Sequence, residues 1–309
     1  MPASIHPTIA VIGSCNVDLV AYVRRVPEAG ETVLGERFAM GFGGKGANQA
    51  VMAARLGARV AMLGAVGDDA YGEQLLANLE AESVETTGVA RMPGSSGVAP
   101  ILVEPGGTNR IVVIPGANGL VDPGAVARSL AAMDQVDVVL GQLEIPQAVT
   151  AAAFEVARGR GATTVLNPAP AATLEPRLLA ATDWLIPNAG ELEALTGRSS
   201  ADDALLMVAD DLSLGLVVSL GADGAVLVRD SQVARIAAPT VAVVDTTGAG
   251  DAFVGAFGVG LALGLDPVAA VRLGIACASD SVGRPGAQAS YPDRRRAAEL
   301  RAWVMAAAG

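Results

Sequence analysis

Residues 240–265 read TVAVVDTTGAGDAFVGAFGVGLALGL and contain three consecutive patterns. Thr240–Val244 is a β-like segment, residues 248–250 are a glycine-rich turn, and Ala249–Leu263 is predicted to be a buried apolar helix. A strand that leads through a glycine-rich turn into a helix is typical of α/β folds. This stretch therefore gives the first indication of the fold class.

Outward from this stretch, strand and helix patterns alternate from about residue 120 to the end of the chain. The predicted strands are Val136–Leu140, Thr163–Asn167, Trp184–Ile186, Leu216–Ser219 and Ala225–Arg229. The other predicted helices of this half are Ile145–Arg158, Ala189–Leu195, Asp266–Ser279 and Asp293–Met305. Strands separated by helical lengths indicate a parallel sheet that is covered by helices on both faces.

The first half of the chain begins in the same way and then changes character. The α/β pattern there consists of strands at Thr8–Ile12 and Arg59–Leu63 and helices at Gly46–Leu56 and Ala70–Ser83. Weak alternation predicts antiparallel strands at 16–20, 32–38, Gly97–Val103 and Arg110–Ile114, the last two joined by a Pro-Gly-Gly turn at 105–107. These four strands are expected to form one small sheet.

The sequence thus predicts an α/β fold. We expect a three-layer sandwich with a mostly parallel central sheet and helices on both faces, plus a small antiparallel β-lid. The predicted core comprises residues 1–15, 44–96 and 116–309, and the predicted lid comprises residues 16–43 and 97–115.

Composition excludes several classes of protein. The 309 residues are 51% hydrophobic and 17% charged, which argues against a disordered chain. The net charge of −11 argues against nucleic acid or an anionic membrane as a partner, because both require basic patches. The longest apolar run, Ala252–Leu265, is too short to span a bilayer, and residues 1–8 lack the features of a signal peptide. A cytoplasmic protein is expected.

Three scarce residue types narrow the possible chemistry. A single histidine, His6, argues against a Ser-His-Asp triad and against a histidine-rich metal site. Cys15 and Cys277 lie in apolar stretches and are expected to be inert buried thiols. All of the 21 basic residues are arginines except Lys45, which lies inside a glycine loop. A compact ammonium group is therefore expected to have a role there.

That loop, Gly41–Asn48, opens a predicted helix. Its glycines allow close approach of the backbone to a ligand, and a helix start presents free N–H groups. The loop also matches the pattern G-x-G-x-x-G, and Asp68 lies about 20 residues further on, as in dinucleotide-binding folds. An NAD-dependent oxidoreductase is thus a remote alternative. The position argues against it, because the dinucleotide loop follows the first buried strand, which here ends at Gly13.

The second loop, Val244–Asp251, precedes the longest apolar helix. Gly248-Ala249-Gly250 would direct several N–H groups at one point, which suits an anion such as a phosphoryl group in transfer. Asp251 falls in the first helical turn. A helix cap is its simplest explanation. Phosphoryl transfer to an alcohol, however, requires a base for the hydroxyl proton, and a carboxylate is suited to that role.

These loops resemble the two signatures of the ribokinase-type (PfkB) carbohydrate kinases. The first signature is matched by GGKGANQA at 43–50 and the second by DTTGAGD at 245–251. Further matching stretches are 13–18 (GSCNVD), 187–191 (PNAGE), 219–224 (SLGADG) and 286–288 (GAQ). The resemblance extends through most of the chain. It implies the family's fold, an α/β sandwich with a β-lid, in which dimers often form lid to lid.

The resemblance also implies roles by position. It implies sugar contacts by Asn16, Asp18, Gly44, Lys45, Asn48, Glu144 and Asp251. It implies that Asp251 is the general base and that the backbone of Gly248, Ala249 and Gly250 stabilises the transferring phosphoryl group. ATP contacts are implied for Asn188, Ser219, Gly221, Ala222, Asp223, Gly224 and Gly250. Potassium ligands are implied at Asp245, Thr247, Ser281, Arg284, Gly286 and Ser290, and Glu191 would act on Mg²⁺ through water.

The function implied by the resemblance is ATP-dependent phosphorylation of the 5-hydroxyl of D-ribose by a homodimer that associates through its lid. Other acceptors remain possible: deoxyribose, fructose, a fructose phosphate or adenosine. A phosphorylated acceptor would need several cations, and the sugar-binding loops offer only Lys45, which favours a neutral sugar. A sugar-binding regulator without activity is a further alternative. The intact loop at 248–251 argues against it, because binding alone requires neither an anion hole nor a base.

Overall fold

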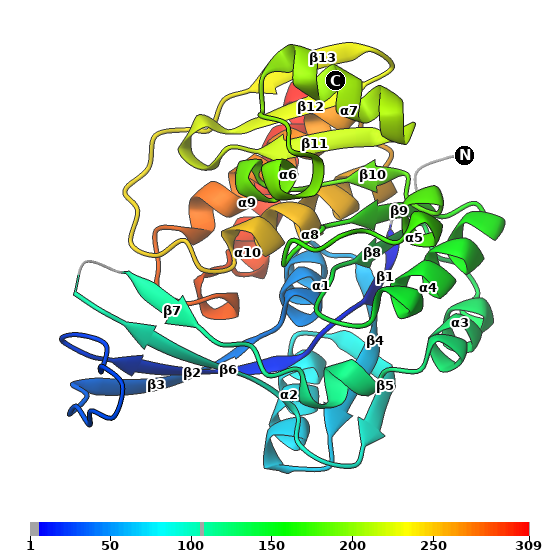
Figure 1. Cartoon of the computed structure of the whole chain (residues 1–309). Coiled ribbons are helices and arrows are strands. Elements are labelled where there is room, and N and C mark those ends of the chain that lie inside the picture. Colours follow the sequence, from blue (N-terminus) through cyan, green and yellow to red (C-terminus); the bar gives the residue numbers. More distant parts are fainter. Residues whose placement is uncertain (1–5, 106–107, 309) are drawn as a thin grey trace.

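The computed structural model describes residues 6–105 and 108–308, and these residues form two β-sheets (Figure 1). The large sheet has nine strands, in the order β13 (Gln232–Ile236), β12 (Ala225–Arg229), β11 (Gly215–Ser219), β10 (Trp184–Leu185), β9 (Thr163–Leu166), β8 (Val138–Gly141), β1 (Thr8–Ile12), β4 (Arg59–Gly67) and β5 (Val84–Met92). The pairs β11–β12 and β12–β13 are antiparallel, and all other neighbouring strands of this sheet pair in parallel. The predicted mostly parallel central sheet is confirmed.

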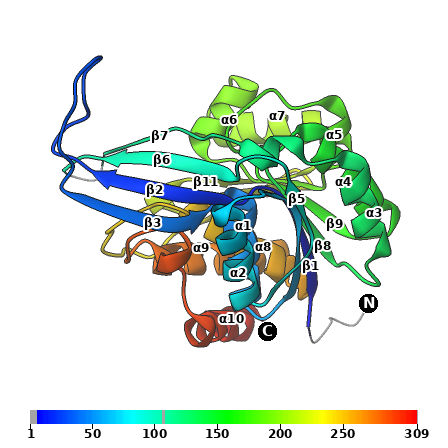
Figure 2. The same ribbon diagram turned by 90° about the horizontal axis from the view of Figure 1, so that it is seen from below.

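Helices cover both faces of this sheet, as the view in Figure 2 shows. One face carries α1 (Lys45–Arg55), α2 (Ala70–Ala81), α8 (Ala249–Ala262), α9 (Pro267–Ser281) and α10 (Arg294–Ala308). The other carries α3 (Pro123–Ala132), α4 (Gln147–Gly159), α5 (Pro176–Ala180), α6 (Ala189–Thr196) and α7 (Asp202–Leu212). The three-layer sandwich is thereby confirmed.

The alternation of side chains along each strand produces the two cores. Ile9 and Val11 of β1 pack with α1 and α8, whereas Ala10 and Ile12 pack with α3 and α4. Successive residues of a strand point to opposite faces, and both faces of this sheet are buried. This is why Thr8–Ile12 is an uninterrupted apolar run with all five residues buried.

The second sheet has four strands in the order β3 (Arg37–Gly43), β2 (Asn16–Tyr22), β6 (Gly97–Val103) and β7 (Asn109–Ile111). The pairs β2–β3 and β6–β7 are antiparallel, as predicted, and β2 and β6 join them by parallel pairing. Figures 1 and 2 show this sheet projecting from one side of the sandwich. The predicted Pro-Gly-Gly turn includes residues 106–107, which lie outside the described residues.

Two predicted strands are wrong. Thr240–Val244 forms no strand, and Val243 and Val244 are 60% and 62% exposed. β-branched residues favour strands only where a partner strand and a face to bury are available, and this segment has neither. The strand predicted at 32–38 begins only at Arg37, because its partner β2 pairs with residues 37–43.

The prediction also missed elements at the edges of the sheet and on its surface. The strand β5 was missed because its sequence, VETTGVARM, mixes buried and exposed residues, and its pairing with β4 shifts register between Ala61 and Leu63. The strand β13 and the helices α3 and α7 were missed as well. Elements with only a partly buried side have a weak hydrophobic pattern, so their sequences give little signal.

Close backbone packing joins the glycine loop to the end of β1. A Cβ atom on Gly46 would lie 2.6 Å from the Ser14 nitrogen and 2.7 Å from the Gly13 carbonyl carbon. The Ala47 N–H donates to the Ser14 carbonyl over 2.9 Å. The first turn of α1 is thus pressed against the chain just after β1, and only glycine fits at position 46.

We therefore predict that Gly46→Ala destabilises the fold by about 2 kcal/mol or more, because the methyl group must displace backbone atoms rather than a flexible side chain. Equilibrium urea unfolding would measure this change. Gly159→Ala is the matched control, since a Cβ on that exposed helical glycine meets nothing within 4 Å and should be neutral or slightly stabilising. Equal unfolding midpoints for the two variants would contradict the prediction.

Candidate active site

A cavity of about 220 Å³ lies at the carboxyl ends of several parallel strands. Asn167 directly follows β9, Asn188 follows β10, and Ser219 ends β11. The other lining residues are Lys45, Ala169, Ile186, Glu191, Thr246, Gly248, Gly250, Asp251, Phe253 and Val254. Open α/β sheets bind ligands at this edge. Seven residues that the sequence nominated therefore line one cavity: Lys45, Asn188, Glu191, Ser219, Gly248, Gly250 and Asp251.

The start of α8 forms one wall of this cavity. Gly248 is the N-cap residue, with a φ of 74°, and it provides no side-chain cap. The Tyr291 hydroxyl donates to the Gly248 carbonyl over 2.9 Å and holds the turn from behind. The Ala249 N–H donates to the Thr246 carbonyl over 3.2 Å, so it closes the turn. The positive end of the helix dipole faces the cavity, which favours an anion there.

Asp251 lies in the first turn of α8 and is only 5% exposed. Its two carboxylate oxygens each accept a hydrogen bond from a side-chain amide of α1. Asn48 Nδ2 donates to Oδ2 over 2.9 Å, and Gln49 Nε2 donates to Oδ1 over 3.2 Å. These donors offset the cost of burying the charge and fix the plane of the carboxylate.

Lys45 is the only positively charged residue among the described residues that line the cavity. Burial lowers the pKa of its ammonium group, but the negative charges of Asp251, Glu144 and Glu191 outweigh burial and leave the pKa raised. The side chain therefore stays charged at neutral pH. Arginine is bulkier and planar, so the single lysine suits a small hydroxyl-rich site.

Asn16, Asp18 and Glu144, which the sequence predicts to bind the sugar, lie near this cavity. Asn118 Nδ2 donates to Asn16 Oδ1 over 2.8 Å, which fixes the Asn16 amide. Glu144 Oε2 accepts from the Lys45 backbone N–H over 2.9 Å and from the Ser14 hydroxyl. These contacts hold two polar side chains at the junction of β1, β2 and α1.

Asp18 is the most perturbed carboxyl group of this region. Burial, together with the nearby charges of Glu144 and Asp251, raises its pKa to about 7. Gly43 lies against it, because a Cβ there would be 2.5 Å from both carboxylate oxygens. Gly44 has a φ of 86°, and a Cβ on it would lie 2.7 Å from the Asn16 nitrogen. These two glycines of the loop thus leave room for Asp18 and Asn16, the side chains predicted to bind the sugar.

The predicted ATP residues divide into two groups. Gly221 and Asp223 line a neighbouring cavity of about 690 Å³, which shares Asn188 and Ser219 with the first. Asn188 and Glu191 cap α6 reciprocally, each accepting from the other's backbone N–H over 2.8 Å. Ala222 and Gly224 line neither cavity. A groove for an extended ligand therefore runs from α8 past α6 to the turn after β11.

The predicted potassium residues also come together, at the junction of the 245–247 loop with the segment after α9. Asp245 accepts from the Thr247 N–H over 2.9 Å, the Thr247 hydroxyl over 2.7 Å and the Gly286 N–H over 2.8 Å. Burial raises the pKa of Asp245, but these donors outweigh burial and lower it. The carboxylate is therefore ionised and ties the two segments together.

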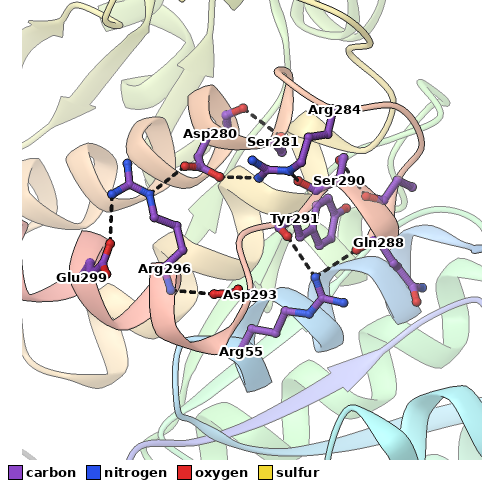
Figure 3. Close-up of polar contacts among 12 residues, drawn as sticks. Arg55, Asp280, Ser281, Arg284, Gln288, Ser290, Tyr291, Asp293, Arg296 and Glu299 are labelled. Atoms are coloured by element: carbon purple, nitrogen blue, oxygen red, sulfur yellow. Dashed lines mark hydrogen bonds and ion pairs between the residues drawn. The ribbon is translucent and has the colours of Figure 1, made fainter.

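Arg284 and Ser290 have partners of their own in this region. Figure 3 shows Arg284 directed toward Asp280, with which it forms an ion pair, and toward Ser290. Its Nε donates to the Ser290 carbonyl over 2.9 Å, and its backbone N–H donates to the Ser281 carbonyl over 3.1 Å. In residues 6–105 and 108–308, no three His, Cys, Asp or Glu side chains are grouped so as to hold a metal ion.

Several functional candidates were missed from the sequence. Asn167 lines the cavity, and Gln49, Gln142 and Gln288 form the hydrogen bonds that surround Asp251. A signal was present, because each is a carboxamide within or just after an apolar stretch. Buried polar side chains require partners, and those partners come from distant segments.

Comparisons with known proteins agree with this geometry. Residues 6–294 match the pfkB family of carbohydrate kinases. The chain is 41% identical to the ribokinase of Bacillus subtilis over 293 residues, covering 94% of this chain and 98% of that protein. It is 38% identical to the deoxyribokinase of Salmonella typhi over 291 residues, covering 92% and 95%. Its structure resembles that of Arabidopsis thaliana ribokinase complexed with ribose and ATP, with 29% identity, a TM-score of 0.85 and coverage of 96% and 99%.

Of the helices in the described part of the chain, none has both the length and the apolar character needed to cross a membrane.

The raised pKa of Asp18 leads to a prediction about stability. Because its pKa of about 7 in the folded protein exceeds the value of 3.8 for a free carboxyl, ionisation opposes folding, and this contribution lowers stability as pH rises from about 4 to 7. Asp18→Asn should therefore stabilise the ligand-free protein, by about 2–3 kcal/mol more at pH 8 than at pH 5, while weakening sugar binding.

Thermal unfolding at the two pH values, with and without sugar, measures both effects. Asp134→Asn is the control, since it makes the same chemical change at an exposed carboxyl that lies away from the cavity. A gain in stability that does not depend on pH would exclude ionisation of Asp18 as the cause.

Proposed function

The chain belongs to the pfkB family of carbohydrate kinases, and from this premise we propose that it transfers the γ-phosphoryl group of ATP to the 5-hydroxyl of D-ribose. It is a ribokinase-like phosphotransferase, as its identity with the Bacillus subtilis ribokinase indicates. The observation that carries the proposal is the position of Asp251. This buried carboxylate faces a cavity that also contains Lys45 and the start of α8.

The charges of the site support a neutral sugar as acceptor. Lys45 alone supplies positive charge among the described lining residues, whereas a sugar phosphate would require more. Asp18 and Glu144 provide carboxylate acceptors for hydroxyl groups, and Asn16 provides an amide. Deoxyribose is the second candidate, because the chain is also 38% identical to a deoxyribokinase that covers 92% of it.

Each residue then has a physical role in the transfer. Asp251 accepts the proton of the attacking hydroxyl as the new oxygen–phosphorus bond forms and the bond from the γ-phosphorus to ADP breaks, with ADP as the leaving group; this is the role of a general base. The N-terminus of α8, at Gly248–Gly250, stabilises the negative charge of the transferring group. Lys45 adds a fixed positive charge next to the same centre. Catalysis thus rests on positioning and electrostatics rather than on a covalent intermediate.

ATP would lie along the groove formed by the two adjoining cavities. We assign its contacts to Asn188, Ser219, Gly221, Asp223 and Gly250, which line these cavities, and to Ala222 and Gly224, which belong to the same turn as Gly221 but line neither cavity. Glu191 lines one of these cavities. One of its two carboxylate oxygens, Oε2, belongs to the capping box of α6 and accepts from the Asn188 N–H. Its other oxygen suits the water shell of Mg²⁺, which when bound neutralises phosphate charge.

The potassium assignment rests on an all-oxygen donor set. The carboxylate of Asp245, the Thr247 hydroxyl and backbone carbonyls near Ser281, Gly286 and Ser290 are the donors that a hard monovalent cation prefers. Arg284 already donates to the Ser290 carbonyl, so that oxygen would be shared. These residues brace the loop that precedes α8, and a cation bound there would fix the turn at Gly248.

We also propose a homodimer, with residues 16–43 and 97–115 as the lid through which it forms. Both edge strands of the small sheet and their flanking segments expose large apolar side chains: Leu34, Phe38, Met40, Ile111, Val112, Val113 and Ile114. Phe38 and Met40 alternate along β3 and share one face. An exposed apolar surface of this kind marks an interaction site.

The function predicts a specific dependence on Asp251. Asp251→Asn should lower kcat with D-ribose at least about 100-fold, because the amide cannot accept the hydroxyl proton. ADP release would be measured for D-ribose, 2-deoxyribose, fructose 6-phosphate and adenosine, with ATP affinity of the variant as the control for intact binding. Near-normal turnover of the variant would exclude Asp251 as the base, and a faster wild-type rate with another acceptor would replace ribose as substrate.

The dimer is tested separately. Phe38→Glu should weaken self-association at least about tenfold, because a charge would be buried against an apolar partner surface. Sedimentation velocity over a range of concentrations measures this. Trp303→Glu is the matched control, since this aromatic side chain on α10 is 63% exposed but lies outside the lid. A monomeric wild-type protein, or a dimer broken only by Trp303→Glu, would refute association through the lid.

A further inference from the structure

Two chains of side-chain amides end on the carboxylate of Asp251. In the first, Gln142 Nε2 donates to Gln49 Oε1 over 2.6 Å, and Gln49 Nε2 donates to Asp251 Oδ1 over 3.2 Å. Gln142 and Gln49 are both fully buried. This chain connects the residue that follows β8 with α1 and then with α8.

The second chain ends on the other carboxylate oxygen of Asp251. Asn78 Nδ2 of α2 donates to Gln288 Oε1 over 2.8 Å, Gln288 Nε2 donates to Asn48 Oδ1 over 3.0 Å, and Asn48 Nδ2 donates to Asp251 Oδ2. Gln288 belongs to η3 (Gln288–Ser290), whose backbone is held by Arg55. Figure 3 shows Arg55 directed at the Gln288 and Tyr291 carbonyls, to which it donates over 3.0 and 3.1 Å.

The carboxylate of Asp251 fixes the direction of the hydrogen bonds in both chains. A carboxylate only accepts hydrogen bonds, so the Asn48 and Gln49 amides must turn their NH₂ groups toward it. Their oxygens then face outward and require donors, which Gln288 and Gln142 supply. Every amide of the two chains is thereby set in one orientation, and successive hydrogen bonds strengthen one another.

At the end of the first chain, this constraint on amide orientation leaves one buried oxygen without a partner. Gln142 Oε1 is buried, and the described residues offer it no hydrogen-bond partner. Turning the Gln142 amide would place its oxygen against Gln49 Oε1, and turning both amides would place an oxygen against the carboxylate. A network that served packing alone would avoid an unpaired buried acceptor. Gln142 Oε1 is left unpaired because the oxygens of Asp251 require hydrogen-bond donors, and this requirement sets the orientation of both amides.

We propose that Gln49, Gln142, Gln288 and Asn78 are positioning residues that hold Asp251 ionised, with its carboxylate plane fixed toward the attacking hydroxyl. This inference rests on the proposed function, in which Asp251 is the general base. The other titratable groups that act on Asp251 electrostatically are Asp18, Lys45, Glu191 and Tyr291. None of these belongs to the two chains, so the chains can be changed without altering the charge of the site.

The test uses the full-length enzyme and changes residues that do not line the cavity. Gln142→Met should lower kcat about 5- to 10-fold, leave KM for the sugar within about twofold, and move the acidic limb of the kcat pH profile up by about half a pH unit. Gln49→Met removes a donor to Asp251 itself, so its effect on kcat and on the limb should be larger. A carboxylate that loses a donor takes up a proton more readily, which gives the direction of the shift.

Thr150→Val is the matched control. Thr150 Oγ1 is the other buried side-chain atom without a partner among the described residues, and its methyl group packs near Gly141 of β8. Removing that hydroxyl should leave kcat and the pH profile unchanged. Asn78→Leu tests the second chain at a half-buried position on α2, and it keeps the proposal testable if the core variants fail to fold.

The outcomes separate this inference from the proposed function. If Asp251→Asn abolishes turnover while the Gln49, Gln142 and Asn78 variants keep the wild-type kcat and acidic limb, the two chains do not position the base. A parallel loss of melting temperature and kcat without movement of the limb would assign them to structure alone and overturn the proposal. Normal turnover of Asp251→Asn would instead refute the base assignment on which the proposal rests.

Discussion

Backbone contact between the end of β1 and the start of α1 is the constraint on which the site depends. Gly46 lies so close to Gly13 and Ser14 that no side chain fits between them, and the Ala47 N–H is bonded to the Ser14 carbonyl. This contact fixes the first turn of α1, and with it Asn48 and Gln49, opposite α8. A looser loop would separate these amides from Asp251, whose buried charge would then lack donors.

Charge is the second organising feature. Glu144 and Asp251 both act on Asp18, and Lys45 is the only residue with positive charge among the described residues that line the cavity. Such an arrangement costs stability in the absence of ligand, as the raised pKa of Asp18 indicates. Hydroxyl groups of a sugar would donate to these carboxylates and relieve the cost. Strain of this kind is typical of sites that are selected for binding rather than for stability.

The two series of hydrogen-bonded amides connect this site to distant parts of the polypeptide. Through Gln288 and Asn48, the segment that follows α9 contacts the predicted base, and through Gln142 the end of β8 does the same. The bracing of that segment by Arg55, Asp245 and Arg284 therefore bears on the geometry of Asp251. The site is built from segments that are far apart in sequence, so its precision depends on the packing of the whole sandwich.

By itself the sequence determined the fold class, most buried strands and helices, and the residues of the two loops. Buried strands such as Thr8–Ile12 and local glycine motifs carry their signal in consecutive residues, so the pattern suffices. Only the tertiary structure decided that Thr240–Val244 forms no strand, that β5 extends the sheet, and that Gln49, Gln142 and Gln288 converge on Asp251. Edge pairing and buried amide partners depend on segments brought together from across the chain, and no local pattern records which segments will meet.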